Sequence, residues 1–153
     1  MTFRLSLILF ELLVVGGGLL IGYLTPPGDW YAQLVKPAFN PPGWVFAPVW
    51  MTLYVLIALS GWRVFRLRER HSTRTSMRLW WIQLALNFLW SPFFFGMHLI
   101  GAALGILSFL FMTVLGFLIA TWPHDRLAVF LFIPYTIWIA FAGVLNGSIF
   151  LLN

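Results

Sequence analysis

The sequence predicts an all-α integral membrane protein, folded as an up-and-down bundle of five transmembrane helices in a single domain, residues 1–153. Its 153 residues are 61% hydrophobic and 8% charged, whereas a soluble domain is about 45–50% apolar and about 25% charged. Five apolar segments approach the roughly 20 residues that cross a bilayer core of about 30 Å. None of them shows the sustained period-two alternation that is typical of a transmembrane β-barrel.

The expected helices follow one another along the chain with one long connection. We expect them at residues 5–24, 44–65, 79–99, 101–122 and 127–152. The first apolar run lacks a small-residue cleavage site, so we interpret it as a retained span and not as a signal peptide. The connections are a long loop at 25–43, a basic loop at 66–78 and two tight turns. Tight turns make neighbouring helices antiparallel, so the two termini should lie on opposite faces of the membrane.

Basic residues concentrate on one predicted face of the membrane. Its arginines are Arg4, Arg63, Arg66, Arg68, Arg70, Arg74, Arg78 and Arg126. The opposite face carries only Lys36. The positive-inside rule therefore places the N-terminus and loop 66–78 in the cytoplasm, and loop 25–43 and the C-terminus on the other side. We interpret the net charge of +5 as topological, in preference to a site for an anionic lipid or a protein, and not as a nucleic-acid surface.

The first helix carries one carboxylate and several glycines. Glu11 lies inside the apolar zone, where a charge is costly, so it is either a functional group or a protonated or paired one. Its candidate partners are Arg4, Arg63 and His124. Gly16, Gly17, Gly18 and Gly22 remove side-chain bulk, which permits either close helix packing or a hollow beside the backbone.

Three other helices have polar or aromatic stripes that should face the bundle interior, because unsatisfied amides are costly in hydrocarbon. The stripe of the second helix is Phe46, Trp50, Tyr54 and Ile57. The stripe of the third is Trp80, Gln83, Asn87, Trp90 and Phe94. The stripe of the fifth is Tyr135, Trp138, Ala142, Leu145 and Ile149, with Asn146 beside it. Pro92 and Pro134 should bend their helices, and the fourth helix offers only the small-residue pair Gly101 and Gly105.

The depth of the tryptophans predicts a pocket. Trp44, Trp62, Trp80, Trp81 and Trp122 lie near helix ends, where an interfacial position explains an indole. At about 1.5 Å per residue, however, Trp50, Trp90 and Trp138 lie well inside the bilayer. The loop above them is rich in tryptophan and proline, and Pro41-Pro42 should make it a stiff lid that leads into the second helix. The alternative is that these rings simply fill the core of the bundle.

Several classes of chemistry lack their motifs. The chain has no cysteine, no phosphate-binding glycine loop and no cluster of carboxylates. His71, His98 and His124 are scattered, so we expect no metal site. Only Glu11 is ionisable within the apolar zone, which gives an ion channel or a proton-coupled transporter little support.

Three motifs resemble those of the tryptophan-rich sensory protein/translocator protein family, also called TspO/MBR or peripheral-type benzodiazepine receptor. The first is Trp30-Tyr31…Lys36-Pro37…Pro41-Pro42…Trp44…Phe46…Pro48…Trp50. The second is Gln83-Leu84-x-Leu86-Asn87-x-x-Trp90-Ser91-Pro92. The third is Pro134-Tyr135-x-x-Trp138-x-x-Phe141-Ala142-x-x-Leu145-Asn146. The likeness covers nearly the whole chain, and the chain resembles a bacterial member of the family.

The resemblance implies a bacterial membrane protein, commonly a homodimer surrounded by lipid, with five transmembrane helices and no required cofactor. It implies a receptor or sensor that binds porphyrins such as protoporphyrin IX or haem-type tetrapyrroles, and drug-like hydrophobic molecules, under the first loop. The matching pocket positions, with Phe46 added from its stripe, are Tyr31, Pro42, Phe46, Trp50, Asn87, Trp90, Trp138, Ala142 and Leu145.

The resemblance also implies two alternatives to plain binding. One is a light- and oxygen-dependent degradation of porphyrins, for which Trp50 and Trp138 are the candidate catalytic residues. The other is passive transport of tetrapyrroles or sterols. The sequence ends at Asn153, without the C-terminal cholesterol motif of some members, so we do not expect sterol recognition by that motif.

Overall fold

The computed structural model describes residues 3–67 and 71–153, and its regular secondary structure within these ranges is entirely helical. Its elements are α1 (Phe3–Glu11), η1 (Leu12–Gly16), α2 (Gly17–Leu24), α3 (Asp29–Gln33), α4 (Gly43–Arg66), η2 (His71–Thr73), α5 (Arg74–Ser91), η3 (Pro92–Gly96), α6 (Ile100–Thr121) and α7 (Arg126–Leu152). The π-helical turns η1 and η3 continue α1 and α5 without a break in the helical run.

Four helical runs are long and apolar enough to cross a membrane. They are Arg4–Leu24, Gly43–Arg66, Ile100–Thr121 and Arg126–Leu152. The predicted third span, 79–99, corresponds to α5 and η3, which are not among the four, so the predicted count of five is not confirmed. The reason lies in α5 itself: it begins at Arg74 instead of residue 79, and contains Arg78, Gln83 and Asn87.

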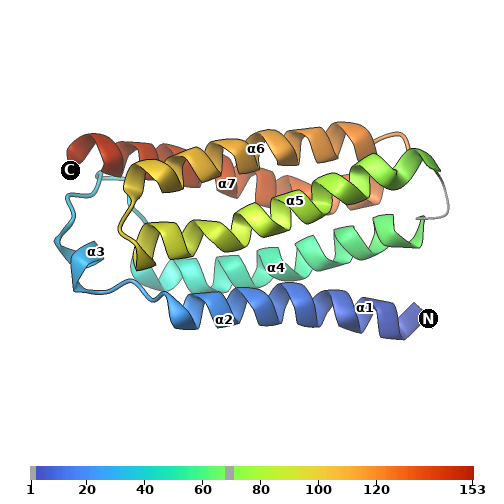
Figure 1. Cartoon of the computed structure of the whole chain (residues 1–153), viewed down its shortest axis with the longest axis horizontal. Coiled ribbons are helices and arrows are strands. Elements are labelled where there is room, and N and C mark those ends of the chain that lie inside the picture. Colours follow the sequence, from blue (N-terminus) through green and yellow to red (C-terminus); the bar gives the residue numbers. More distant parts are fainter. Residues whose placement is uncertain (1–2, 68–70) are drawn as a thin grey trace.

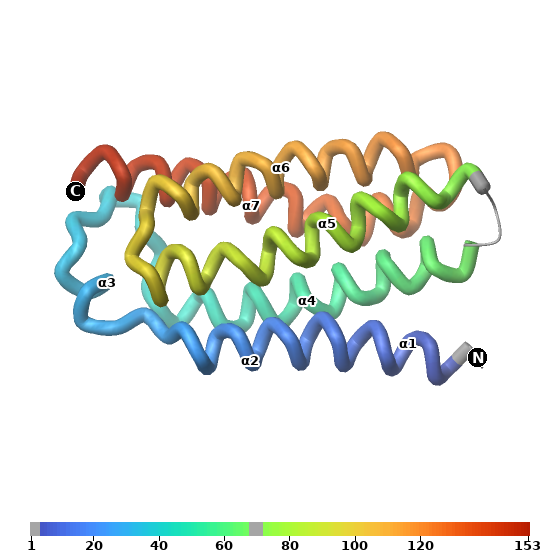
Figure 2. The backbone as a smooth tube through the Cα atoms, in the orientation of Figure 1, coloured from blue at the N-terminus to red at the C-terminus, as the bar shows by residue number. Residues whose placement is uncertain are grey.

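The long helices form a closed ring of neighbours. α5 packs mainly against α6, α6 against α7, α7 against α4, and α4 against α1 and η1, while α2 returns to α5. The helices run lengthwise beside one another, as Figures 1 and 2 show. The first described residues and the C-terminus lie at opposite ends of the bundle (Figure 2), as the alternation of spans predicts. α3 lies at the same end as the C-terminus (Figure 1).

The described arginines lie near the ends of their helices, at the end of the bundle opposite α3 (Figure 1). Arg68 and Arg70 lie outside the described residues. Arg63 forms an ion pair with Asp125, with Nε 3.0 Å from Oδ2. Asp125 also caps α7, because its Oδ1 accepts a hydrogen bond from the Ala128 amide at 3.0 Å. The acidic partner of Arg63 is therefore Asp125 and not Glu11.

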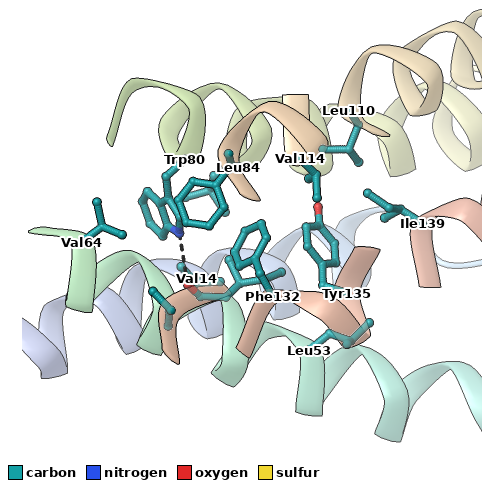
Figure 3. Close-up of a cluster of buried hydrophobic side chains, with 14 of the residues drawn as sticks. Val14, Leu53, Val64, Trp80, Leu84, Leu110, Val114, Phe132, Tyr135 and Ile139 are labelled. Atoms are coloured by element: carbon teal, nitrogen blue, oxygen red, sulfur yellow. Dashed lines mark hydrogen bonds between the residues drawn. The ribbon is translucent and has the colours of Figure 1, made fainter. Parts of the chain in front are cut away.

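The core contains two tryptophans that the sequence placed at the interface. Trp80 is fully buried, and its indole N–H donates to the Ile57 carbonyl at 3.1 Å. Trp62 is buried and donates to Ser6 Oγ at 3.1 Å. Figure 3 shows Trp80 and its hydrogen bond within the buried cluster that also contains Phe132. Trp62 and Trp80 lie near helix ends, as predicted, but they face the interior of the bundle, where their neighbours provide both an apolar cover and an acceptor for each indole.

Glycines allow rings to rest on helix backbones. A Cβ atom at Gly17 would lie 2.7 Å from the Phe88 ring, and one at Gly18 would overlap the Tyr54 ring. Around Gly16 and Gly22, by contrast, there is open space. The first helix therefore uses Gly17 and Gly18 for close packing, the usual role of small residues between membrane helices.

The polar stripes face inward, as predicted. Gln83, Asn87 and Asn146 are buried. Asn87 donates to the Tyr135 hydroxyl at 2.9 Å, which joins α5 to α7. Pro92 ends the α-helical hydrogen bonding of α5, and the chain continues as the π-helical turn η3.

The long loop contains one element that the sequence did not predict, the five-residue helix α3. Pro42 has an extended conformation and precedes the first residue of α4, as expected for a proline pair at a helix start. Trp30 stacks on His98 with ring centroids 4.1 Å apart. His98 has φ 59°, a value uncommon for a residue with a side chain, and lies in the turn between η3 and α6.

The loop is also tied to the end of α7. Asn153 accepts a hydrogen bond from the Val35 amide at 2.9 Å and donates to the Val35 carbonyl at 3.0 Å. A side-chain amide thus pairs with both backbone groups of one loop residue. Together with the Trp30–His98 stack, this contact holds the loop over the end of the bundle.

The first prediction concerns Gly61, where an added Cβ atom would overlap the indole of Trp80. We expect Gly61→Ala to lower the free energy of unfolding by about 1–3 kcal/mol, because it displaces a fully packed ring. Thermal unfolding in one detergent measures the difference. Gly143→Ala is the control, since nothing lies within 4 Å of the added atom. Equal stability of the two variants would show that the Trp80 contact is not constrained.

The second prediction concerns the tie between loop and helix. Asn153→Ala removes both hydrogen bonds to Val35. Each contributes about 0.5–1.5 kcal/mol, so we expect roughly tenfold faster hydrogen–deuterium exchange of the Val35 amide. The control is Ser148→Ala, which loses only a bond to the Val144 carbonyl of its own helix. An unchanged exchange rate at Val35 would rule out Asn153 as an anchor of the loop.

Candidate ligand pocket

A cavity of about 710 Å³ lies at the loop end of the bundle, between the long loop and the halves of the helices nearest to it. Small-molecule sites usually enclose about 300–1,000 Å³. Residues from α2, α4, α5, η3, α6 and α7 line it, together with residues of the loop. The wall is predominantly apolar and aromatic, with a few polar side chains, which is the composition expected of a site for a hydrophobic ligand.

The structure brings the predicted site residues together, with one exception. The predicted residues that line the cavity are Tyr31, Phe46, Trp50, Asn87, Trp90, Trp138, Ala142 and Leu145. Pro42 is not part of the wall, although its neighbours Pro41 and Gly43 are. Its position at the start of α4 explains the difference, since it shapes the entry of the helix. That these residues bind a ligand stays a prediction.

Two tryptophans from different helices form a corner of the cavity. The rings of Trp50 on α4 and Trp138 on α7 are 6.5 Å apart and nearly perpendicular, at 88°. Phe46 extends this wall, with its ring 5.9 Å from that of Trp138. Within the described chain, neither the Trp50 nor the Trp138 indole N–H has a hydrogen-bond partner. Both side chains therefore offer an aromatic surface and a free donor to a ligand.

The third deep tryptophan is held differently. The Trp90 indole N–H donates to Asn146 Oδ1 at 3.1 Å. Asn146 in turn donates to the Ile100 carbonyl at 3.1 Å. The Trp90 ring also stacks on Phe94, with centroids 5.2 Å apart. Trp90 therefore presents its ring to the cavity, while its donor connects α5 with α7 and the start of α6.

Asn87 is similarly engaged. Its amide N–H donates to Tyr135, and its Oδ1 atom is buried without a hydrogen-bond partner among the described residues. One donor of Asn87 is therefore engaged within the bundle, while its Oδ1 atom remains able to accept a hydrogen bond from a ligand. Asn87 contributes to the wall mainly by fixing Tyr135, which contacts Trp50 with ring centroids 6.4 Å apart.

The outer edge of the cavity is its more polar part. Thr25 and Ser91 share a hydrogen bond of 2.7 Å between their hydroxyl groups, which links the end of α2 to the end of α5. The Tyr31 hydroxyl lies 3.4 Å from Asn40 Oδ1, to which it donates. Burial raises the pKa of Tyr31, and the contact with Asn40 partly offsets that rise. Tyr31 is therefore a neutral hydrogen-bonding group at physiological pH.

One side of the cavity reaches the outer surface of the bundle. Leu19, Tyr23 and Met51 belong to its lining, yet their exposed fractions are 53%, 82% and 40%. Leu19 and Tyr23 lie on α2 and Met51 on α4. α2 packs against α5, whereas the main contacts of α4 with the first helical run are made by α1 and η1. The cavity is thus open between α2 and α4, on a surface that faces lipid in a membrane.

Some lining residues had no signal in the sequence. Leu107 and Leu110 come from α6, whose apolar pattern distinguishes no face. Phe95 enters the wall because the π-helical turn after Pro92 changes the register of side chains. Lys36 was assigned only to topology, although it also lines the cavity. Among the described residues, no group of three or more His, Asp or Glu side chains is arranged to hold a metal ion.

Comparisons with known proteins agree with this architecture. The model of the TspO/MBR family matches residues 10–152. The chain is 38% identical over 133 residues to the "Protein CrtK" of Rhodobacter capsulatus, covering 86% of this chain and 83% of that protein. It is 36% identical over 148 residues to a "Tryptophan-rich sensory protein" of Cereibacter sphaeroides, covering 97% and 92%.

The similarity extends to animal proteins. The "Translocator protein" of Homo sapiens is 36% identical over 119 residues, which cover 76% of this chain and 70% of the human one. Because the family model matches residues 10–152, its match includes every helix that contributes to the cavity wall. Together with its apolar helices, these similarities identify an integral membrane protein. The chain belongs to the TspO/MBR family.

Proposed function

We propose that this protein is a membrane receptor or sensor that encloses a porphyrin-type ligand in the cavity beneath its long loop. Family membership supports the membrane sensor or receptor role. The observation that carries the ligand class is the corner formed by Trp50 and Trp138, whose ring centroids are 6.5 Å apart and whose N–H groups have no partner among the described residues. A flat macrocycle stacks on one indole while its edge meets the other.

Binding would proceed by enclosure between rigid and adjustable parts. Hydrogen bonds join α5 to α7 beside the cavity, and the Trp80 indole joins α5 to α4. The loop is held by the Asn153–Val35 contact, the Trp30–His98 stack and the packing of its aromatic side chains against Phe94 and Phe95. A ligand that exchanges water and lipid contacts for aromatic surface gains the hydrophobic and stacking free energy of that burial. No acid–base residue is required for this function.

We also infer the membrane arrangement. α5 and η3 form the fifth crossing, because they run alongside the four apolar spans and bury Trp80, Gln83 and Asn87 among them. The arginine-rich end faces the cytoplasm and the loop end the opposite side, in accordance with the positive-inside rule. A homodimer in a bacterial membrane remains the expectation from the family resemblance, with lipid around it.

The third prediction tests binding. We expect the Trp50→Ala/Trp138→Ala double variant to bind protoporphyrin IX at least tenfold more weakly than wild type, because two stacking surfaces of about 0.5–1.5 kcal/mol each are lost with their buried area. Porphyrin fluorescence in nanodiscs measures the dissociation constants. Trp81→Ala/Trp122→Ala is the control, since both rings are exposed and outside the cavity.

Folding of each variant is checked by circular dichroism and thermal unfolding. Trp50→Phe/Trp138→Phe, which keeps the aromatic surface and removes both indole donors, separates stacking from hydrogen bonding. Undiminished affinity in the alanine double variant would contradict the proposed ligand position, and absence of binding by the wild type would contradict the ligand class.

A second candidate function is the degradation of a bound porphyrin in light and oxygen. The specific observation in its favour is the placement on the cavity wall of two indoles whose N–H groups have no partner in the described part of the chain. In the proposed step, one electron passes from an indole to the photoexcited porphyrin. The indole is thereby oxidised by one electron and the porphyrin reduced by one. The reduced porphyrin combines with dioxygen and returns one electron to the indole as the ring opens, so that dioxygen supplies both oxygen atoms of the product and the indole is regenerated.

The fourth prediction distinguishes this turnover from binding alone. Illuminated, aerated wild type with protoporphyrin IX should form a new chromophore faster than free porphyrin does, and Trp138→Phe should slow it while retaining affinity. Absorption spectra during illumination provide the rates, and an argon-purged sample is the control for oxygen. Equal rates for wild type and Trp138→Phe would assign any bleaching to the porphyrin itself.

A further inference from the structure

We propose that Lys36 selects ligands that carry a carboxylate, by pairing with that group at the outer edge of the cavity. The inference rests on the proposed binding function and specifies which members of the ligand class the site prefers. Three observations carry it: the isolation of this charge in the cavity wall, the geometry that holds its ammonium group, and the absence of a competing acid among its described neighbours.

Lys36 is the one charged side chain among the described residues that line the cavity. It is also the only lysine of the sequence, and the described arginines lie at the far end of the bundle. The rest of the wall is apolar, aromatic or neutral and polar. A single cation in such a wall gives the site a defined electrostatic sign at its outer edge, where the polar groups of an amphipathic ligand would lie.

The ammonium group of Lys36 is positioned by the loop itself. Its Nζ atom donates to the Ala32 carbonyl at 3.2 Å and to the Leu34 carbonyl at 3.1 Å. It also lies 4.6 Å from the centroid of the Tyr31 ring, a cation–π contact. An ammonium group has three N–H donors, so two are engaged by carbonyls and one remains for an acceptor.

No carboxylate competes for this donor within the described chain. The one ion pair there joins Arg63 and Asp125, at the other end of the bundle. Asp29, the acidic residue of α3, does not line the cavity. Carbonyl groups orient the ammonium but leave its charge uncompensated. A ligand carboxylate would supply both the missing charge and a charge-assisted hydrogen bond, which is stronger than a bond between neutral groups.

Tyr31 and Asn40 complete this edge of the site. Both line the cavity beside Lys36. Tyr31 therefore holds the lysine through its ring and presents a neutral hydroxyl nearby. The ligand that fits these contacts has a flat apolar body, which lies among Trp50, Trp138 and Phe46, and an anionic group, which lies at the loop. A neutral ester of the same body would retain the apolar contacts and lose the ionic one.

The experiment compares protoporphyrin IX, a dicarboxylic acid, with its dimethyl ester in nanodiscs of phosphatidylcholine. Dissociation constants are measured for wild type, Lys36→Met and Lys36→Arg. Methionine keeps an unbranched apolar side chain without charge, and arginine restores the charge. Each probe partitions into lipid to the same extent for every variant. The change between variants in the ratio of the two dissociation constants, acid to ester, therefore reports the effect of Lys36 alone.

We expect Lys36→Met to raise the dissociation constant of the acid about tenfold, the size expected for the loss of one hydrogen bond to a charged group. The dissociation constant of the ester should not change. Lys36→Arg should recover most of the preference. An acid-to-ester ratio that is the same in wild type and Lys36→Met overturns the inference while leaving the proposed function intact. Failure of both probes to bind the wild type overturns the proposed function and the inference with it.

A lipid phosphate is the other anion that could reach Lys36, and a second arm distinguishes it. The titrations are repeated in nanodiscs that contain phosphatidylglycerol. If the anionic lipid lowers the affinity of the acid in wild type but not in Lys36→Met, the lipid headgroup occupies Lys36 and carboxylate selectivity is overturned. An acid affinity of the wild type that is independent of the lipid supports pairing between Lys36 and the ligand.

Discussion

The bundle depends on satisfying polar side chains between helices where hydrocarbon provides no partner. In a bilayer an unpaired donor or acceptor is costly, and several indoles and amides inside the bundle bond to one another or to a backbone carbonyl, whereas the buried Gln83 amide has no partner among the described residues. Trp80 bonds to the backbone of α4. Trp90 bonds to Asn146 on α7, and Asn87 to Tyr135 on the same helix. These contacts fix where α5 lies, although its own sequence is the least apolar of the long helices.

The same hydrogen bonds divide the buried tryptophans by role. Trp62, Trp80 and Trp90 have acceptors and belong to the scaffold. Trp50 and Trp138 have none among the described residues and form the corner of the cavity. Burial alone does not separate the two groups, because all five rings are at least partly covered. The separation follows from the donors, which is why removing an indole should affect stability in one group and binding in the other.

The cavity has two boundaries of different character. At its outer edge the loop contributes hydroxyl, amide and ammonium groups. Between α2 and α4, exposed apolar side chains form its limit. An amphipathic ligand fits such a site in one orientation, with its apolar body toward lipid and the helices and its polar end toward the loop. The glycines of α2 make this possible, since Gly18 admits the Tyr54 ring and Gly22 leaves open space at the wall.

The sequence by itself determined the helical class, the inward polar and aromatic faces and the deep aromatic part of the cavity wall, because a period of 3.6 and the cost of buried amides are local properties. Deep indoles such as Trp138 were recognisable from distance along a helix. Only the tertiary structure decided which donors are paired, that Asp125 and not Glu11 meets Arg63, and that Leu107 joins the wall. These outcomes depend on the rotation of each helix against its neighbours and on the change of register at η3, and neither is encoded within a single segment.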